Sequence, residues 1–162
     1  IPNGSGCKLL DWDSASTIHW GVLLLFAGGI AIAKAFAITG ISTAIGDALS
    51  GVTRLSIIVV IAVVAMAVTF LTEITSNTAT TALLMPILAA ASLGAGFEPA
   101  LLMLPAALSA SCAFMLPVAT GPNAIVFGTG KITVEQMVRE GLVLNLIGIL
   151  VITAVVYFWL GN

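Results

Sequence analysis

The stretch Thr72-Glu73-Ile74-Thr75-Ser76-Asn77-Thr78-Ala79-Thr80-Thr81 is a polar interruption between two apolar runs, residues 55–71 and 82–93. Polar backbone at membrane depth is tolerated only where it is buried in protein or lines a cavity. A helical hairpin that enters a bilayer and returns to the same side satisfies this rule. We therefore predict a re-entrant hairpin over residues 55–95, with its tip at 76–78.

The composition indicates that lipid is the solvent of this chain. Hydrophobic residues make up 60% of the 162 residues, charged residues only 7%, and the mean hydropathy is +1.20. A soluble domain carries about a quarter charged residues, so this chain has too few polar groups to cover its surface in water. The net charge of −2 and five scattered basic residues give no sign of nucleic-acid binding. The predicted fold class is an all-α integral membrane protein.

The rest of the chain can be divided by hydropathy, since a spanning helix needs about 20 apolar residues. Gly28 and Gly29 should allow the first spanning helix to pack closely on a neighbour, and Thr133 is placed to cap a short helix. The predicted segments are a polar lead-in or linker at 1–19, a transmembrane helix at 20–38, an interfacial amphipathic helix at 39–54, a charged connector at 131–140 and a last transmembrane helix at 141–160.

A second polar interruption lies in the apolar segment 98–129. We predict a helix from residue 100 to 118, a break at Ala119-Thr120-Gly121-Pro122-Asn123, and a short helical continuation. Pro122 lacks a backbone donor and disfavours helical geometry at the preceding glycine. The segment is therefore predicted to be a broken transmembrane helix.

Two interrupted helices are a sequence sign of a transporter's binding site. At the first interruption, Ser76 or Thr75 can cap the following helix, whose free amide groups and positive dipole end suit a carboxylate or phosphate. Asn77 and Thr78 add polar side chains there. The second interruption offers Thr120, Asn123 and free carbonyl oxygens, and oxygen ligands suit hard cations.

No Lys, Arg or His occurs between Arg54 and Lys131. An anion bound at the interruptions therefore meets no cationic side chain from this segment. A helix dipole contributes only about 0.3–1 kcal/mol at an exposed site, whereas desolvating a carboxylate costs several kcal/mol. A bound cation would make up the difference, so we predict cation-coupled anion transport.

Several features have a purely structural interpretation as well. Serine and threonine in membrane helices often bond to their own backbone or join helices, and a Gly-Pro pair often only kinks a helix. Glu73 is a functional candidate as an intramembrane carboxylate, but an equally good structural hydrogen-bonding group. Cys112 is interpreted as a small buried hydrophobe, and His19 has no partner ligand for a metal. We see no constellation of an enzyme and expect none.

Three blocks of this sequence resemble the divalent anion/sodium symporter family, which includes the bacterial INDY-type dicarboxylate transporters. The resemblance covers nearly the whole chain, in order and spacing. The blocks are Trp20-Gly21-Val22-Leu23-Leu24-Leu25-Phe26-Ala27-Gly28-Gly29, then Thr72-Glu73-Ile74-Thr75-Ser76-Asn77-Thr78-Ala79, then Ser111-Cys112-Ala113-Phe114-Met115-Leu116-Pro117-Val118-Ala119-Thr120-Gly121-Pro122-Asn123-Ala124-Ile125-Val126-Phe127.

The resemblance implies a secondary transporter with two inverted repeats, each holding a hairpin tipped by Ser-Asn-Thr and a broken helix with a Thr-Pro-Pro-type motif. This chain is similar to most of the second repeat, so the first repeat is an expected partner. A homodimer, a lipid bilayer as surroundings and an elevator-like movement against a scaffold are also implied, with a multi-pass location in the inner (plasma) membrane.

The resemblance also implies the site. It places Ser76, Asn77, Thr78, Thr120 and Pro122 at the substrate, and it places sodium on Thr72, Thr75, Asn77, Ala119 and Gly121, with backbone oxygens at 75, 119 and 121. Where the family usually has proline, this chain has Gly121. Because a backbone carbonyl is expected there, coordination should survive in a less rigid loop.

The function we expect is symport of sodium with a small C4 dicarboxylate such as succinate, malate or fumarate. Sulfate or a tricarboxylate such as citrate is the alternative substrate for the same machinery. A channel or a structural membrane subunit is the alternative of another class.

Overall fold

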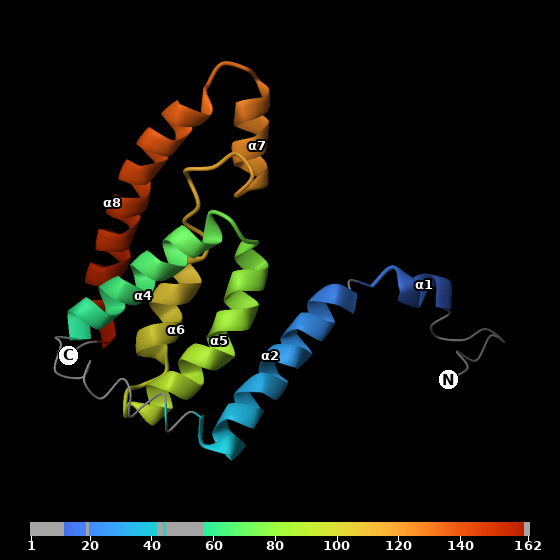
Figure 1. Cartoon of the computed structure of the whole chain (residues 1–162), viewed down its shortest axis with the longest axis vertical. Helices are drawn as coiled ribbons and strands as arrows, with labels where there is room; N and C mark the ends of the chain where they lie inside the picture. Colours follow the sequence, from blue (N-terminus) through green and yellow to red (C-terminus); the bar gives the residue numbers. More distant parts are fainter. Residues whose placement is uncertain (1–11, 19, 42–43, 45–56, 161–162) are drawn as a thin grey trace.

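Every regular element in the described part of the chain is a helix (Figure 1). The computed structural model describes residues 12–18, 20–41, 44 and 57–160. The all-α prediction is confirmed over these residues. The predicted interfacial helix at 39–54 and the first eleven residues of the lead-in lie almost wholly outside them. The helices are α1 (Trp12–Ser16), α2 (Trp20–Thr39), α4 (Ile57–Thr72), α5 (Asn77–Gly94), α6 (Ala100–Ser109), α7 (Gly121–Gly128) and α8 (Val134–Leu160).

Helices α4, α6 and α8 pack on one another, and α5 covers α6 on the other side (Figure 1). Their core is made of small and branched apolar side chains, which allow close helix contact. Its main cluster contains Ile61, Ala65, Leu101, Ile149, Ile152 and Val156, and a second cluster contains Val68, Ala106 and Ala110. This packed body is what carries the two polar interruptions.

Helix α2 contacts the body through α5. A Cβ atom at Gly29 would lie 3.0 Å from the carbonyl oxygen of Ala82 and 3.3 Å from Cγ of Pro86. Only glycine permits this approach without a shift. The close packing predicted for the glycine pair is therefore found at Gly29, while a Cβ at Gly28 would meet no atom within 4 Å.

Helices α4 and α5 are joined by a four-residue turn, residues 73–76. Ser76 has extended backbone angles (φ −72°, ψ 130°), and its side chain accepts a hydrogen bond from the amide of Ala79. Helix α5 ends in a Schellman motif in which Gly96 takes the left-handed conformation (φ 75°) and Phe97 donates to the carbonyl of Ser92. The α4–α5 pair is thus a helical hairpin; its re-entrant course in a bilayer stays a prediction.

The break in the second segment is longer than predicted. Helix α6 ends at Ser109, not at residue 118, and the chain is non-helical until α7 begins at Gly121. In place of helical bonds, the carboxylate of Glu73 accepts the amides of residues 114–116, and the Asn123 side chain donates to two loop carbonyls. We call residues 110–120 the break loop. Side chains from elsewhere hold the amides of residues 114–116, while backbone turn bonds remain at residues 110–112 and 119.

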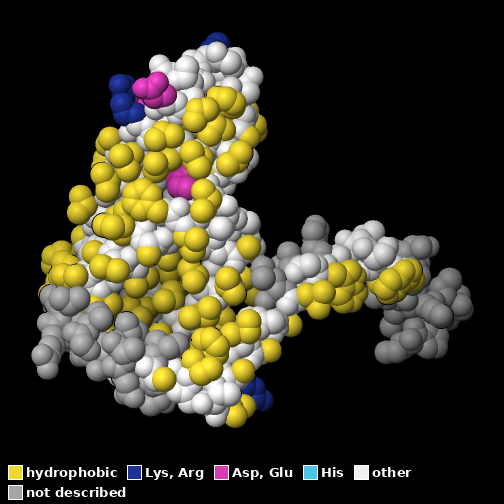
Figure 2. Space-filling model, viewed as in Figure 1, with side chains coloured by type: hydrophobic (Ala, Val, Ile, Leu, Met, Phe, Trp, Pro, Cys, Tyr) yellow, Lys and Arg dark blue, Asp and Glu magenta, His cyan; other side chains and the backbone are white. Residues whose placement is uncertain are grey.

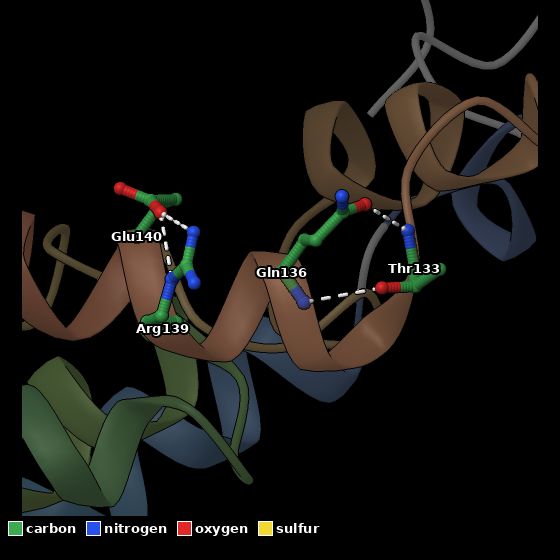
Figure 3. A network of polar contacts seen from close by, with 4 residues as sticks. All are labelled: Thr133, Gln136, Arg139 and Glu140. Carbon is green, nitrogen blue, oxygen red and sulfur yellow. Dashed lines mark hydrogen bonds and ion pairs between the residues drawn. The ribbon is translucent and has the colours of Figure 1, made fainter.

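The charged connector and the last span form one helix, α8, rather than two segments. Its start is a capping box: the Gln136 amide donates to the Thr133 hydroxyl at 3.2 Å, and the Thr133 amide donates to the Gln136 side chain at 3.0 Å (Figure 3). An exposed ion pair joins Arg139 to Glu140 one turn later. Thr133 therefore does cap a helix, but a long one.

The surface agrees with a lipid environment. Hydrophobic side chains are spread over the whole face seen in Figure 2, and the basic side chains visible there lie at its two ends. Among the described residues, two helices are long and apolar enough to cross a membrane, Asn77–Gly94 and Val134–Leu160; the apolar helices α4 and α6 are shorter.

Candidate functional site

A cavity of about 540 Å³ lies where the α4–α5 turn meets the break loop. It brings together the two interruptions that the sequence places more than 40 residues apart. It is lined by Ile74, Thr75, Ser76, Asn77, Thr78, Val118, Ala119, Thr120 and Gly121. Seven of the nine residues expected at the site are in this lining; Thr72 and Pro122 are not.

Two helices begin at this cavity, α5 at Asn77 and α7 at Gly121. The first amide groups of a helix have no partner within it. The caps satisfy one such group in each helix, since Thr120 Oγ1 accepts the amide of Asn123 at 3.2 Å and Ser76 Oγ accepts that of Ala79 at 3.5 Å.

The amides of Asn77, Thr78 and Gly121 lie outside both helical ladders, at residues that line the cavity. The positive ends of two helix dipoles also converge there. The cavity lining contains no Lys, Arg or His. What this part of the chain offers an anion is therefore amides, hydroxyls and dipoles.

Oxygen atoms gather beside the start of α5. The hydroxyl of the buried Thr72 lies 2.5 Å from Asn77 Oδ1 and 2.9 Å from the carbonyl oxygen of Ala110. With the Asn77 side chain in this orientation, the Thr72 hydroxyl hydrogen is the only hydrogen among these three oxygens. Such a group of oxygens suits a hard cation. Thr72 thus lies behind Asn77 rather than at the cavity surface.

Thr75 contributes further oxygens in the turn that precedes α5. Its hydroxyl lies 2.6 Å from that of Thr80 and donates to the carbonyl of Leu71 at 2.8 Å. The side chain is therefore engaged within the hairpin. The backbone oxygen of Thr75 as a cation ligand stays a prediction.

Two polar residues that were candidates for binding form hydrogen bonds to the backbone instead. The Asn123 side chain donates to the carbonyls of Ala113 at 2.9 Å and Leu116 at 3.0 Å, inside the break loop. The Glu73 carboxylate, only 4% exposed, accepts four hydrogen bonds. Of the two interpretations left open for Glu73, the structural hydrogen bond is the one observed.

Two residues of α8 that the sequence analysis did not select also support the site. The buried Asn145 donates to Glu73 Oε1 at 2.7 Å. A Cβ at Gly141, one turn earlier, would lie 2.6 Å from the carbonyl carbon of Phe114 and 2.7 Å from Cα of Met115. The sequence signal that could have identified them is an asparagine and a glycine four positions apart in an otherwise apolar helix.

The fold and the cavity define an all-helical membrane segment in which two helix starts face one polar pocket. Residues 6–161 match the family model described as the sodium:sulfate symporter transmembrane region, and the chain belongs to that family. The family resemblance stated from the sequence is thereby confirmed, and the chain is part of a membrane protein.

Individual relatives are similar over almost the same range. The chain is 49% identical over 151 residues to the sodium-dependent dicarboxylate transporter SdcS of Staphylococcus saprophyticus, and 47% identical to that of Staphylococcus aureus (strain USA300). Each match covers 93% of this chain but 29% of the relative. The chain therefore spans less than a third of the length of these transporters.

Proposed function

We propose that this chain supplies one wall of the substrate site in a sodium-coupled symporter of small dicarboxylates. The observation that carries the proposal is the meeting of two helix N-termini at one cavity whose lining has no cationic side chain, with an oxygen cluster directly behind Asn77. The relatives named as sodium-dependent dicarboxylate transporters support the same substrate and ion. The proposed role is transport, not catalysis.

In this proposal a carboxylate of the substrate lies at the two helix starts. Four groups donate hydrogen bonds to it: the hydroxyls of Ser76, Thr78 and Thr120 and the amide of Asn77. Pro122 holds the first turn of α7. Helix dipoles contribute up to about 2 kcal/mol each when partly buried. Because desolvating a carboxylate costs several kcal/mol, the two dipoles together leave the balance close to zero.

Sodium supplies the missing charge. We assign it to oxygens of Thr72, Thr75, Asn77, Ala119 and Gly121, of which all but Thr72 line the cavity. Since these oxygens come from both interruptions, sodium would fix the α4–α5 turn against the break loop. A substrate that needs both helix starts then binds better once sodium is present, which is the basis of coupling.

The cargo we propose is a C4 dicarboxylate such as succinate, malate or fumarate. The first repeat of the same transporter would supply the opposite wall, in a homodimer in the plasma membrane. Movement would be elevator-like, with the hairpin and broken helix shifting against a scaffold that includes α2. Sulfate is the second candidate cargo, because the matched family carries sulfate in its description; citrate is tested with it.

Tracer uptake by the full-length transporter in proteoliposomes tests the proposal. We expect saturable succinate uptake in sodium and little in choline, with malate and fumarate as the strongest competitors. Stronger competition by sulfate or citrate would change the cargo and keep the mechanism. Flux that neither saturates nor depends on sodium would indicate a channel and contradict the proposal.

A further inference from the structure

Glu73 is the one acidic side chain that the described residues bury. It belongs to the α4–α5 turn, directly after Thr72 and two residues before Thr75. Its Oε1 accepts the amides of Phe114 at 2.8 Å and Met115 at 3.0 Å, and its Oε2 accepts the amide of Leu116 at 3.0 Å. One carboxylate therefore holds three consecutive backbone amides of the break loop.

All the recorded partners of this carboxylate donate hydrogen bonds, as an acceptor-only group requires. The fourth donor is the Asn145 side chain of α8. The α8 backbone lies directly against the loop at Gly141. From the other side, Asn123 donates to two of the loop's carbonyls. The loop is thus held through its amides by Glu73 and through its carbonyls by Asn123.

We propose that Glu73 is a positioning residue for the sodium site. The inference rests on the proposed function. The assigned sodium oxygens belong to two segments: Thr72, Thr75 and Asn77 on the hairpin, and Ala119 and Gly121 at the end of the break loop. Besides the contact between Thr72 and Ala110, the Glu73 bonds are the side-chain hydrogen bonds recorded between these two segments.

Glu73 acts on sodium through distance rather than by contact. A sodium ion needs the oxygens of both segments at fixed separations, and the carboxylate bonds set the depth of the loop against the turn. Residues that orient ligands in this way typically change metal affinity by about 10- to 100-fold when they are replaced. The substrate contacts at the helix starts are affected mainly through sodium.

The test is Glu73→Gln in the full-length transporter, with labelled succinate uptake measured against sodium concentration. Glutamine keeps the size but offers one acceptor oxygen, and its NH2 group faces an amide donor. We expect the sodium half-saturation to rise about tenfold or more, while the maximal rate per folded transporter at saturating sodium stays within about twofold of the wild type. Thr153→Val, a buried polar change farther along α8, should leave the half-saturation unchanged.

A double variant separates the hold on the loop from the contact with α8. In Glu73→Gln with Asn145→Asp, the NH2 group of the new glutamine can donate to the new carboxylate only from the place of Oε1, where it faces the amides of Phe114 and Met115. The bond to α8 returns but the hold on the loop does not, so the sodium half-saturation should stay raised. A rate lowered without any shift in half-saturation, or a double variant with the wild-type half-saturation, overturns the proposal.

Two further outcomes are informative. If Glu73→Gln does not fold, Glu73→Asp is judged by the same criterion, since its shorter side chain cannot reach all three amides. If wild-type uptake itself is independent of sodium, the proposed function fails, and this inference fails with it. The wild-type curve thus distinguishes that failure from an unshifted curve in the variant alone.

Discussion

Gly141→Ala is expected to disturb the candidate site from outside it. Gly141 is buried on α8, where the break loop lies on the helix backbone. An added Cβ would be 2.6 Å from the carbonyl carbon of Phe114 and 2.7 Å from Cα of Met115, and closer still to the Phe114 oxygen. These neighbours are backbone atoms held by Glu73, so they cannot move aside as the end of a flexible side chain would.

The free-energy cost of this clash can be isolated with a matched control variant on the same helix. A Cβ at Gly148, two turns on, would lie 3.6 Å from Cys112 Sγ, an ordinary van der Waals distance. Both variants gain the same helix propensity, about 1 kcal/mol for glycine to alanine. The difference between them therefore reports the clash alone, which we expect to cost about 1–3 kcal/mol as in other overpacked cores.

The assay is thermal unfolding of the two full-length variants, followed by their sodium dependence of uptake. Gly148→Ala should match or exceed the wild-type melting temperature, and Gly141→Ala should melt below Gly148→Ala. The sodium half-saturation should rise only in Gly141→Ala, because the displaced loop carries Ala119 and leads directly into Gly121. Equal melting temperatures and equal sodium curves would refute the argument that the loop is held against α8.

Two other substitutions test the break loop. Gly121→Pro restores the family's Thr-Pro-Pro pattern at the first position of α7, where a Cβ would meet no atom within 4 Å. It should raise the free energy of unfolding by about 0.4–1 kcal/mol, because proline restricts the unfolded chain. A lower melting temperature would show that the loop needs glycine. Asn123→Ala removes both donors to the Ala113 and Leu116 carbonyls and should cost about 1–3 kcal/mol. Asn123→Asp, which cannot donate, should be at least as harmful in the same thermal assay, and a neutral Asp variant would contradict the assigned role.

The parts of the site that could be predicted are those fixed by local chemistry. Ser76 and Thr120 are of residue types that favour the N-cap position, and both cap helices. Polar residues that interrupt apolar runs in a membrane must line a cavity or be buried in protein. Seven of the residues expected at the candidate site line one cavity.

The extent of the break could not be predicted because its cause is not local. Residues 111–116 are mostly apolar and contain no glycine or proline, so they read as a continuing helix. The group that holds their amides away from a helix, Glu73, is 41–43 positions earlier in the chain. Likewise, α8 offers no local reason for Gly141, whose meaning appears only when the loop lies on it.

Succinate binding to the full-length transporter tests the central claim most directly. Thr120→Ala removes the cap at the cavity end of α7, and Thr129→Ala removes the hydroxyl that bonds to Val126 at the other end of the same helix. Calorimetric titrations of the wild type in sodium and in choline should give tight succinate binding only in sodium. Thr129→Ala should retain this affinity, whereas Thr120→Ala should weaken it at least about tenfold, because a lost charge-assisted hydrogen bond has about that effect. Binding that is equal in the two salts, or equal in the two variants, would contradict the claim that sodium and these helix starts form one anion site.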